Sequence, residues 1–431
     1  MNQKIKVAYI VVGESLDSDL LRRQVIGLLA DIKAGMQDLE ITLFSFQGIL
    51  SILNHKKDIA ENKIRLRQFG INLVIVPNIC PWPIPNFTFR KTDVGWRPNG
   101  VWNRFAARFF ELAAFPFMLY LKAIKGFDIF HCRSYPAATI AIFLKKIIPN
   151  VVVLFDPRSD FPEENVTSGI WKNGSKDFLY WKRKERDLLM AADAVACIGP
   201  TYVSNYLKNA PIFNSFIAPN NVKCTEFKRK EISREKIRRK LGIDNDVKVY
   251  IYLGGMTKDG WHRPSFYRDF YDSILKKNPS EKIKFLFLVP GFSANLVINA
   301  FGERVNFSVI SPEFDEVADY LSAGDYGMMF LHESKIAVGT KIGEYLAASL
   351  PIIVNPNCIG ASELIKSNPA LGCIVDLGIG DLDSGIFSIL KYQSDQMSFA
   401  DAETLSSFAF GYFDNIKISK TYIEQYKKII R

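Results

Sequence analysis

The chain is poor in the residues that build metal centres and disulfide frameworks. It contains 431 residues but only four histidines and six cysteines, and no two cysteines form a C-x-x-C pair. Such scattered cysteines argue against a zinc site. Cys132 and Cys197 lie in apolar, strand-like runs, where a reduced thiol behaves as a small apolar side chain. We therefore expect no metal and a reducing, cytoplasmic compartment.

Long apolar runs are missing as well. The N-terminal run VAYIVV is short and soon followed by acidic residues, unlike a secretory signal. The apolar stretch FFELAAFPFMLYLKAI is interrupted by Glu111, Pro116 and Lys122, so it is not expected to span a bilayer. The aromatic and basic segment 102–125 around it has two interpretations, a helix on a membrane surface or a core helix of the first half.

Basic residues outnumber acidic ones. The formal net charge of +10 predicts an anionic partner, which nucleic acid, an acidic membrane surface or a phosphate-bearing small molecule could provide. Much of the excess lies in KRKEISREKIRRK (228–240), which alternates with Glu and is typical of a solvated helix or linker. With 48% hydrophobic residues, a chain of this length is expected to form two or three globular domains.

Apolar strand-like runs alternate with helical patterns along the chain. The first set lies at 7–12, 41–46, 73–77, 128–132, 151–156 and 194–199, and a second at 247–255, 284–291, 305–311, 326–331, 351–355 and 373–377. Near-continuous apolar strands between helices indicate parallel sheets covered on both faces. We predict two Rossmann-like, doubly wound α/β domains (1–215 and 233–408) joined by a linker at 216–232 and facing across a cleft.

Residues at the carboxyl ends of predicted strands are the candidate site residues, because ligands bind there in such sheets. Gly254 and Gly255 end one strand, with Lys258 nearby. Adjacent glycines let backbone N–H groups approach a phosphate, although the pattern is neither G-x-G-x-x-G nor a Walker loop. An ordinary strand-end turn is the alternative.

The segment VGTKIGEYLAASLPIIV (338–354) predicts a helix that begins near Thr340 and Lys341. Unpaired N–H groups at a helix start suit a phosphate. Glu344 is one turn further on the same face as Thr340, where it could accept hydrogen bonds from two hydroxyls. Alternatively, its carboxylate simply complements the helix dipole, which is worth about 0.3–1 kcal/mol.

A third group belongs to the first half. His131 and Arg133 end one strand, and Asp156 with Arg158 end another. The His and the two guanidinium groups could bind an acceptor hydroxyl and anionic groups, whereas Asp156 is expected to hold the local turn. The acidic pair in DLD (381–383) lies in a Gly-rich segment and is not expected to bind metal.

Several segments together resemble the retaining GT-B glycosyltransferases of glycosyltransferase family 4, especially bacterial surface-polysaccharide enzymes. They are DIFHCRSYPAA, FDPRSDFPEENVTSGIW, IAPNNVKCTEF, YLGGM, FDEVADYLSAGDYGMMFL, GTKIGEYLAASLPIIV and FDNIKISKTYIEQY. Taken in order, these segments extend over almost the whole chain. Asn221, Lys223 and Ser349 replace residues that are usually Gly, Asp and Gly in these motifs.

The resemblance implies transfer of a sugar from a nucleotide diphosphate donor to a saccharide acceptor, expected to be lipid-linked, without cofactor, metal or nucleic acid. It also implies a C-terminal helix (409–431) that crosses back to the first domain, and a place in the cytoplasm or on the inner face of the membrane. By position, Glu344 would bind the donor ribose, whereas His131 would contact the donor sugar and Arg158 would lie at the acceptor side. The residues expected near the diphosphate are Gly254, Gly255, Lys258, Thr340 and Lys341.

One departure concerns a Glu-x7-Glu pair that many members carry. Ile336 stands eight residues before Glu344, and Glu333, Ser334 or backbone amides would have to replace the first Glu. Two other functions therefore stay open at this point. One is a sugar-nucleotide epimerase of the same architecture, and the other is a non-catalytic partner protein with a degenerate site.

Overall fold

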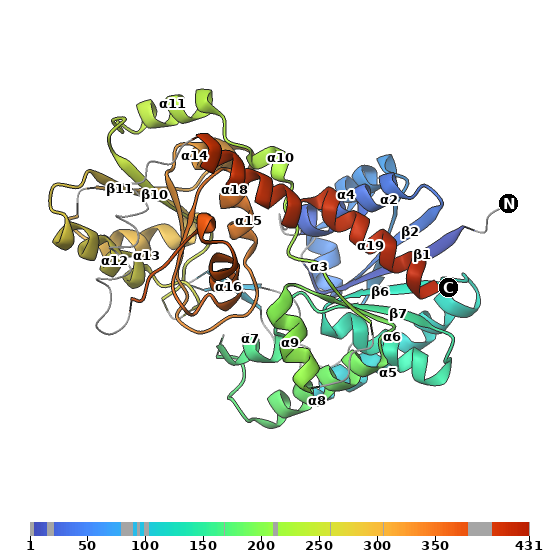
Figure 1. The fold of residues 1–431 in the computed structure, drawn as a ribbon. Helices are drawn as coiled ribbons and strands as arrows, with labels where there is room; N and C mark the ends of the chain where they lie inside the picture. The colour runs from blue at the N-terminus through green and yellow to red at the C-terminus, as the bar shows by residue number, and fades with distance from the viewer. Residues whose placement is uncertain are drawn as a thin grey trace. The chain divides into compact units, whose positions relative to one another are not determined.

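The computed structural model describes residues 4–14, 21–78, 89–92, 95–98, 103–167, 169–209, 214–258, 260–304, 306–377 and 399–430. They form two compact units, shown in Figure 1. The first contains the described residues of Met1–Arg90, Trp96–Asn221 and Asn415–Arg431, and the second those of Lys91–Gly95 and Val222–Asp414. The DLD segment (381–383) lies outside the described residues.

The first unit is built on a seven-stranded sheet of order β3-β2-β1-β6-β7-β8-β9, in which the paired strands are parallel. A separate pair joins β4 (Phe89–Thr92) to β5 (Gly95–Pro98). The strands of the main sheet are β1 (Ile5–Val12), β2 (Leu39–Gln47), β3 (Asn72–Pro77), β6 (Ile129–Arg133), β7 (Val152–Asp156), β8 (Ala194–Cys197) and β9 (Ser215–Ile217). The helices are η1 (Arg22–Gly27), α2 (Leu28–Gly35), α3 (Ile49–Asn54), α4 (Lys56–Gln68), α5 (Arg104–Ala123), α6 (Tyr135–Ile147), α7 (Phe161–Thr167), α8 (Lys176–Ala191), α9 (Pro200–Asn209) and α19 (Asn415–Ile430).

The second unit is built on a six-stranded parallel sheet of order β12-β11-β10-β13-β14-β15. Its strands are β10 (Lys248–Leu253), β11 (Ile283–Leu288), β12 (Phe307–Ile310), β13 (Tyr326–Met329), β14 (Ile352–Val354) and β15 (Gly372–Ile374). The helices are α10 (Cys224–Phe227), α11 (Glu231–Lys240), α12 (Pro264–Lys277), α13 (Gly291–Phe301), η2 (Phe314–Glu316), α14 (Val317–Ser322), α15 (Thr340–Ala347), α16 (Ile359–Ser367), η3 (Pro369–Leu371) and α18 (Phe399–Tyr412).

These two sheets confirm the predicted fold class. Each of the twelve predicted strand segments overlaps a strand of the structure. Apolar side chains alternate between the two faces, as β10 illustrates: Val249 and Ile251 belong to one core cluster and Tyr250 and Tyr252 to the other. Both faces of the sheet are therefore buried under helices, which explains why the strands are apolar throughout.

The predicted return of the C-terminal helix to the first domain is also confirmed. Helix α19 belongs to the first unit, and its Tyr422 and Tyr426 share a core with Tyr9 of β1. It packs closely on α2, because a Cβ built on Gly35 would lie 2.7 Å from Cδ1 of Ile423. The last helix is thus part of the core of the first unit rather than a surface addition.

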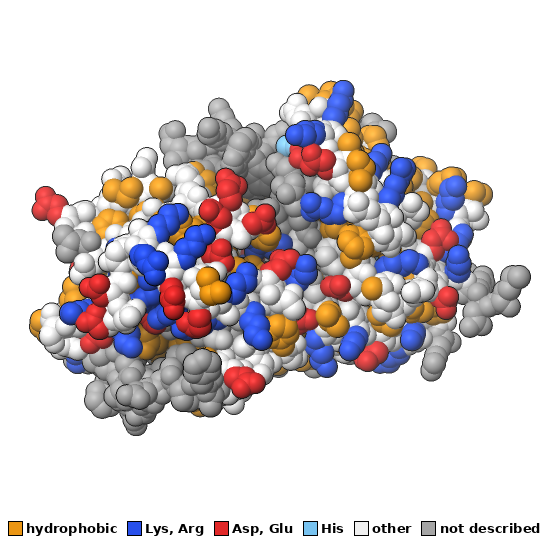
Figure 2. Space-filling model, turned by 90° about the horizontal axis from the view of Figure 1, so that it is seen from above, with side chains coloured by type: hydrophobic (Ala, Val, Ile, Leu, Met, Phe, Trp, Pro, Cys, Tyr) orange, Lys and Arg blue, Asp and Glu red, His pale blue; other side chains and the backbone are white. Residues whose placement is uncertain are grey.

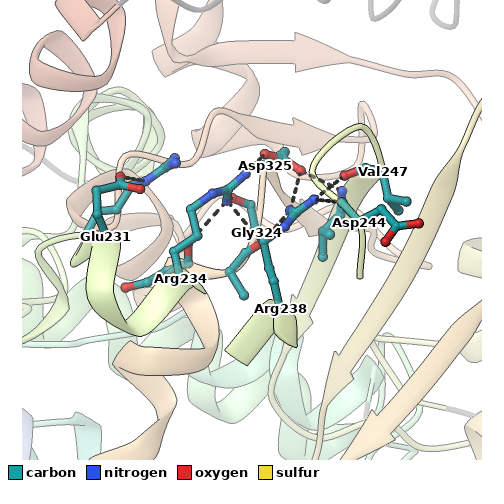
Figure 3. Close-up of polar contacts among 11 residues, drawn as sticks. Glu231, Arg234, Arg238, Asp244, Val247, Gly324 and Asp325 are labelled. Atoms are coloured by element: carbon teal, nitrogen blue, oxygen red, sulfur yellow. Dashed lines mark hydrogen bonds and ion pairs between the residues drawn. The ribbon is translucent and has the colours of Figure 1, made fainter. Parts of the chain in front are cut away.

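Within the basic segment 228–240, residues Glu231–Lys240 form helix α11, and most of them are exposed, as expected for a solvated helix; the correction concerns two arginines that are not simply solvated. Arg234 and Arg238 of α11, one turn apart, point to the end of α14 (Figure 3). Arg234 donates to the carbonyl oxygens of Ser322, Ala323 and Gly324 at 3.3, 3.1 and 2.7 Å, and both guanidinium groups pair with Asp325. These contacts satisfy carbonyl groups that a helix end leaves without intrahelical partners.

Ser349 occupies a left-handed backbone position just after α15, with φ of +58°. Glycine adopts this conformation without steric cost, which explains why the resembled motif carries Gly here. The Ser349 hydroxyl donates to the carbonyl of Ala402 at 2.9 Å. This hydrogen bond offsets part of the cost of the unusual backbone.

Candidate functional site

In the second unit, Tyr345 holds α15 against two strands of the sheet. Its hydroxyl accepts a hydrogen bond from the backbone N–H of Leu253 at 2.7 Å and donates to the carbonyl of Met328 at 3.1 Å. The ring lies on Gly327, where any Cβ would be 2.3 Å from Cγ of Tyr345. Helix α15 is thereby tied to β10 and β13 at once, and Lys341, one turn earlier, shares the face of Tyr345.

Lys341 lies over the end of β10 in a cluster with Tyr252, Gly254 and His262, which we call the lysine cluster. Its Nζ is 3.2 Å from the Tyr252 hydroxyl oxygen and 3.1 Å from Nε2 of His262. Gly254 has φ of +116°, and a Cβ there would lie 3.2 Å from the same Nζ. The backbone conformation therefore favours glycine, and a larger residue would also push the ammonium group of Lys341 away by a few tenths of an ångström.

Burial changes the protonation of this cluster. It lowers the pKa of Lys341 to about 7, although the neighbouring Glu344 carboxylate acts in the opposite direction. Burial and the Lys341 charge lower the pKa of His262 well below its usual value. His262 is therefore neutral; Nδ1 donates to the carbonyl of Phe330 at 3.0 Å, which leaves Nε2 to accept from Lys341. An anion at Nζ would favour the charged lysine.

The other residues predicted near the donor belong to the same unit. Thr340 begins α15. The residue before it, Gly339, has no side chain that could cap the helix. Glu344 lies one turn later and is buried, with 4% of its surface exposed. Gly255 and Lys258 are exposed on the segment that follows β10. The structure thus brings Gly254 and Lys341 together, with Glu344 near enough to raise the pKa of Lys341, and leaves Lys258 on the surface of the segment after β10. Their roles in binding stay predictions.

The segment around Ile336 is held by backbone pairing to the start of α16. The Lys335 N–H donates to the carbonyl of Asn357 at 2.8 Å, and the N–H of Ile359 donates back to Lys335 at 3.0 Å. Ser334 is hydrogen-bonded to Asn357, and Glu333 is exposed. Which group replaces the first Glu of the usual pair stays a prediction.

In the first unit, His131 lies beneath α19 and has no exposed surface. Its Nδ1 is 2.6 Å from the Tyr426 hydroxyl, and its Nε2 is 3.5 Å from Oδ2 of Asp156, which also accepts from Tyr422 at 3.0 Å. Burial lowers the pKa of His131 despite Asp156. Burial tends to raise the pKa of Asp156, but Arg158, His131 and Arg133 outweigh it, so this pKa is lowered. A neutral His131 therefore lies beside an ionised Asp156, and its predicted sugar contact stays a prediction.

Two arginines lie beside this pair. Arg133 donates from Nε to Glu14 at 2.6 Å and from Nη2 to Gln24 at 2.9 Å, whereas Arg158 donates to Asn221 at 3.2 Å. Arg158 has φ of +61°, an unusual conformation for a residue other than glycine. Among the described residues, Nη1 of Arg133 and both Nε and Nη1 of Arg158 find no hydrogen-bond acceptor. These donors could hold an anionic or hydroxyl-rich group.

Asp160 follows β7 and was not a sequence-based candidate. Burial and the carboxylates of Glu163, Glu164 and Glu185 raise its pKa to about 7. The folded protein therefore binds this proton more tightly than the unfolded chain, and its stability falls as pH rises from about 4 to 7. We expect Asp160→Asn to raise the melting temperature by about 2 °C at pH 8 relative to the parent chain.

This gain should disappear at pH 4, where Asp160 is protonated in the folded protein. Thermal melts at both pH values measure it, with Asp315→Asn, an exposed carboxylate in the second unit, as the control. Equal shifts at both pH values would contradict the pKa assignment.

No family model matches the chain, and no curated protein matches it. Solved structures do. A glycosyltransferase from Rickettsia africae superposes with a TM-score of 0.66 at 14% identity, covering 99% of each chain. HepE from Anabaena in complex with UDP and glucose gives 0.64 at 12% identity, covering 98% of this chain and 100% of that one. Sucrose-phosphate synthase from Thermosynechococcus elongatus gives 0.64 at 13% identity, covering 99% of each.

The chain has the GT-B fold. At these identities the similarity establishes the architecture of the backbone, so residue roles depend on the side chains described above. Sequence reasoning missed Tyr252 and His262 of the lysine cluster and Tyr422 and Tyr426 above His131. His262 is one of only four histidines and follows a strand end, which was a usable signal.

Proposed function

We propose that the protein is a retaining glycosyltransferase of family 4 type that uses a nucleotide diphosphate sugar as donor. The observation that carries this proposal is the lysine cluster. In it, Lys341, at the start of α15, lies over Gly254, at the end of β10. An ammonium group, a glycine strand end and a helix N-terminus together suit a diphosphate. The solved structures of HepE with UDP and glucose support the choice of a UDP-sugar as the first donor to test.

The reaction that we propose transfers one glycosyl group. The bond between the anomeric carbon and the diphosphate oxygen breaks, and the diphosphate leaves with the electron pair. The acceptor hydroxyl oxygen forms the new bond to the anomeric carbon on the same face, and its proton passes to an oxygen of the leaving phosphate. Lys341 and the N–H groups at the start of α15 would stabilise the charge that develops on the diphosphate. No step assigned here needs a metal or a protein base.

The acceptor that we propose is a lipid-linked saccharide of bacterial surface-polysaccharide synthesis, such as lipopolysaccharide or capsule. The reaction would take place at the cytoplasmic face of the membrane, with the protein attached peripherally. The net charge of +10 supports binding to an anionic membrane surface of this kind. On the face shown in Figure 2, however, the visible Lys and Arg side chains are interspersed with acidic and apolar ones, so net charge does not locate the contact.

A thermal-shift screen of UDP, GDP, TDP and ADP sugars tests the proposed donor. A ligand that binds only the folded state at 100 times its dissociation constant adds about 2.7 kcal/mol, so we expect one nucleotide series to raise the melting temperature by several degrees. NMR of the product with the matching donor and a saccharide acceptor would then show retained anomeric configuration. Donor conversion without acceptor would identify an epimerase, and no stabilisation by any nucleotide would indicate a non-catalytic partner protein.

A further inference from the structure

Helix α5 has apolar side chains on two opposite faces. One face is buried in the first unit and consists of Ala106, Ala107, Phe110, Ala114, Met118 and Leu121. Large apolar side chains on the other side stay exposed, with Phe105 at 64%, Leu112 at 65% and Ile124, which follows the helix, at 72%. Sequence analysis left a membrane-surface helix and a core helix as alternatives for this segment; the structure shows core packing together with a second, outward apolar face.

The outward side chains form one stripe. Phe105, Phe109, Leu112 and Tyr120 are separated by four, three and eight residues, which places them in one row along the helix. We call this row, together with Ile124, the outer stripe. A helix on the surface of a globular protein normally presents polar side chains to water. A contiguous exposed apolar row marks an interaction surface.

Basic side chains run beside the outer stripe. Arg104 and Arg108 lie one turn apart near the start of α5, and Lys122 and Lys125 lie at its end. Arg104 contacts the Phe105 ring at 4.7 Å, and Lys125 contacts the Tyr120 ring at 5.6 Å. The acidic residue of this helix, Glu111, is buried and paired with Lys184. The exposed charge that α5 itself contributes is therefore positive, and the Asp177 carboxylate of α8 accepts a hydrogen bond from the Arg104 N–H at 3.0 Å at the start of the helix.

Among the described residues, the packing of α5 leaves the stripe exposed. Its inner face packs on α6 and α8, beside which it lies in Figure 1, and Phe115 packs against Phe143 of α6 at 5.5 Å between ring centroids. The helix has 20 residues, a length of about 30 Å at 1.5 Å per residue. Within the described part of the chain, no helix is long and apolar enough to cross a membrane. This helix is therefore suited to lie on a bilayer, not to span one.

We propose that the outer stripe of α5 docks this protein on an anionic bilayer surface. Phe105, Phe109 and Leu112 would enter the boundary between headgroups and acyl chains, while the flanking Arg and Lys side chains bind lipid phosphates. Aromatic rings with a nearby cation suit this interface. This inference rests on the proposed function, because a lipid-linked acceptor is what would bring the protein to a membrane. Its test uses no nucleotide, so the docking surface and the proposed function can fail separately.

Flotation of the full chain with lipid vesicles tests this docking surface. We expect binding to vesicles of phosphatidylglycerol and phosphatidylcholine, weaker binding at high salt, and little binding to phosphatidylcholine alone. Leu112→Glu and Phe105→Glu should each weaken binding about tenfold or more, because each removes a buried apolar side chain and adds a negative charge. Both residues point outward, so the melting temperature should stay unchanged.

Ile232→Glu is the matched control, because Ile232 is 83% exposed on α11 of the second unit and the charge change is the same. It should leave vesicle binding unchanged. The proposal is overturned if the parent chain binds no anionic vesicles, or if Leu112→Glu and Ile232→Glu bind equally. It is also overturned if the parent chain self-associates through this face without binding vesicles and Leu112→Glu abolishes the association.

Discussion

Replacing Lys341 with Met is expected to raise the dissociation constant for the nucleotide diphosphate about 10- to 100-fold. The substitution keeps an unbranched side chain over Gly254 but removes the ammonium group that lies within 3.2 Å of Tyr252 and His262. A hydrogen bond to a charged group contributes about 1.5–3 kcal/mol, which corresponds to this change in affinity. Titration calorimetry with UDP measures it. Met relieves the burial of a charge, so the fold should be retained or stabilised.

The pH dependence of binding gives this prediction a second readout. The pKa of Lys341 is about 7 without ligand, and a bound diphosphate favours the charged form. Above pH 7.5, where the diphosphate itself is fully ionised, binding must therefore take up a proton, and affinity should fall by up to about tenfold per pH unit. Lys341→Met should show no such slope.

The control is Lys282→Met, which removes an exposed ion pair with Asp246 in the same unit. It should bind UDP as the parent chain does. If both variants bind with unchanged affinity and the same pH slope, Lys341 does not contact the diphosphate.

Replacing Asp156 with Ala is expected to cost about 3–5 kcal/mol of stability, the largest structural effect that we predict. Asp156 is 1% exposed, and its carboxylate lies 3.7 Å from Nη1 of Arg158 and accepts from Tyr422. Removing it leaves a guanidinium group buried without its counter-charge and separates β7 from α19. Because the folded pKa of Asp156 is lowered, its contribution is present above about pH 4 and is lost at lower pH.

Urea denaturation at pH 7 measures this loss. Asp128→Ala is a suitable comparison, because Asp128 precedes β6 and accepts a single backbone hydrogen bond, from Lys6 at 2.8 Å. We expect it to cost about 1 kcal/mol. Equal effects of the two substitutions would show that Asp156 does not hold a buried network together.

The sheets could be predicted from sequence because strands buried on both faces are apolar at every position. Runs such as VAYIVV and ITLFSF became β1 and β2, and the change from the first unit to the second after Asn221 falls within 216–232. The short strand β9 (Ser215–Ile217) was missed because it lies at the start of the predicted linker and has only three residues. The dual role of α5 could not be read from its pattern, because apolar residues occur on both of its faces.

The candidate site could be predicted only in part. Gly254, Lys341 and Glu344 could be predicted because they lie at a strand end or near a helix start. The structure places all three in the second unit and brings Gly254 close to Lys341. Their partner His262 comes from a segment eight residues further along the chain, and its contact depends on how that segment folds back. His131 looked accessible at a strand end, but α19, almost 300 residues later in the chain, covers it with Tyr426. Long-range packing of this kind has no local sequence signal.

Hydrogen exchange of the full chain with and without saturating UDP tests whether the donor nucleotide binds at the lysine cluster, because it locates the bound nucleotide. The proposed donor site predicts protection of the backbone amides in 254–263 and 339–345, and loss of that protection in Lys341→Met. The amides of α5 should exchange at the same rate with and without UDP. Nucleotide-dependent protection that is absent from both segments, or found only in the first unit, would contradict the assignment of the donor site to the lysine cluster.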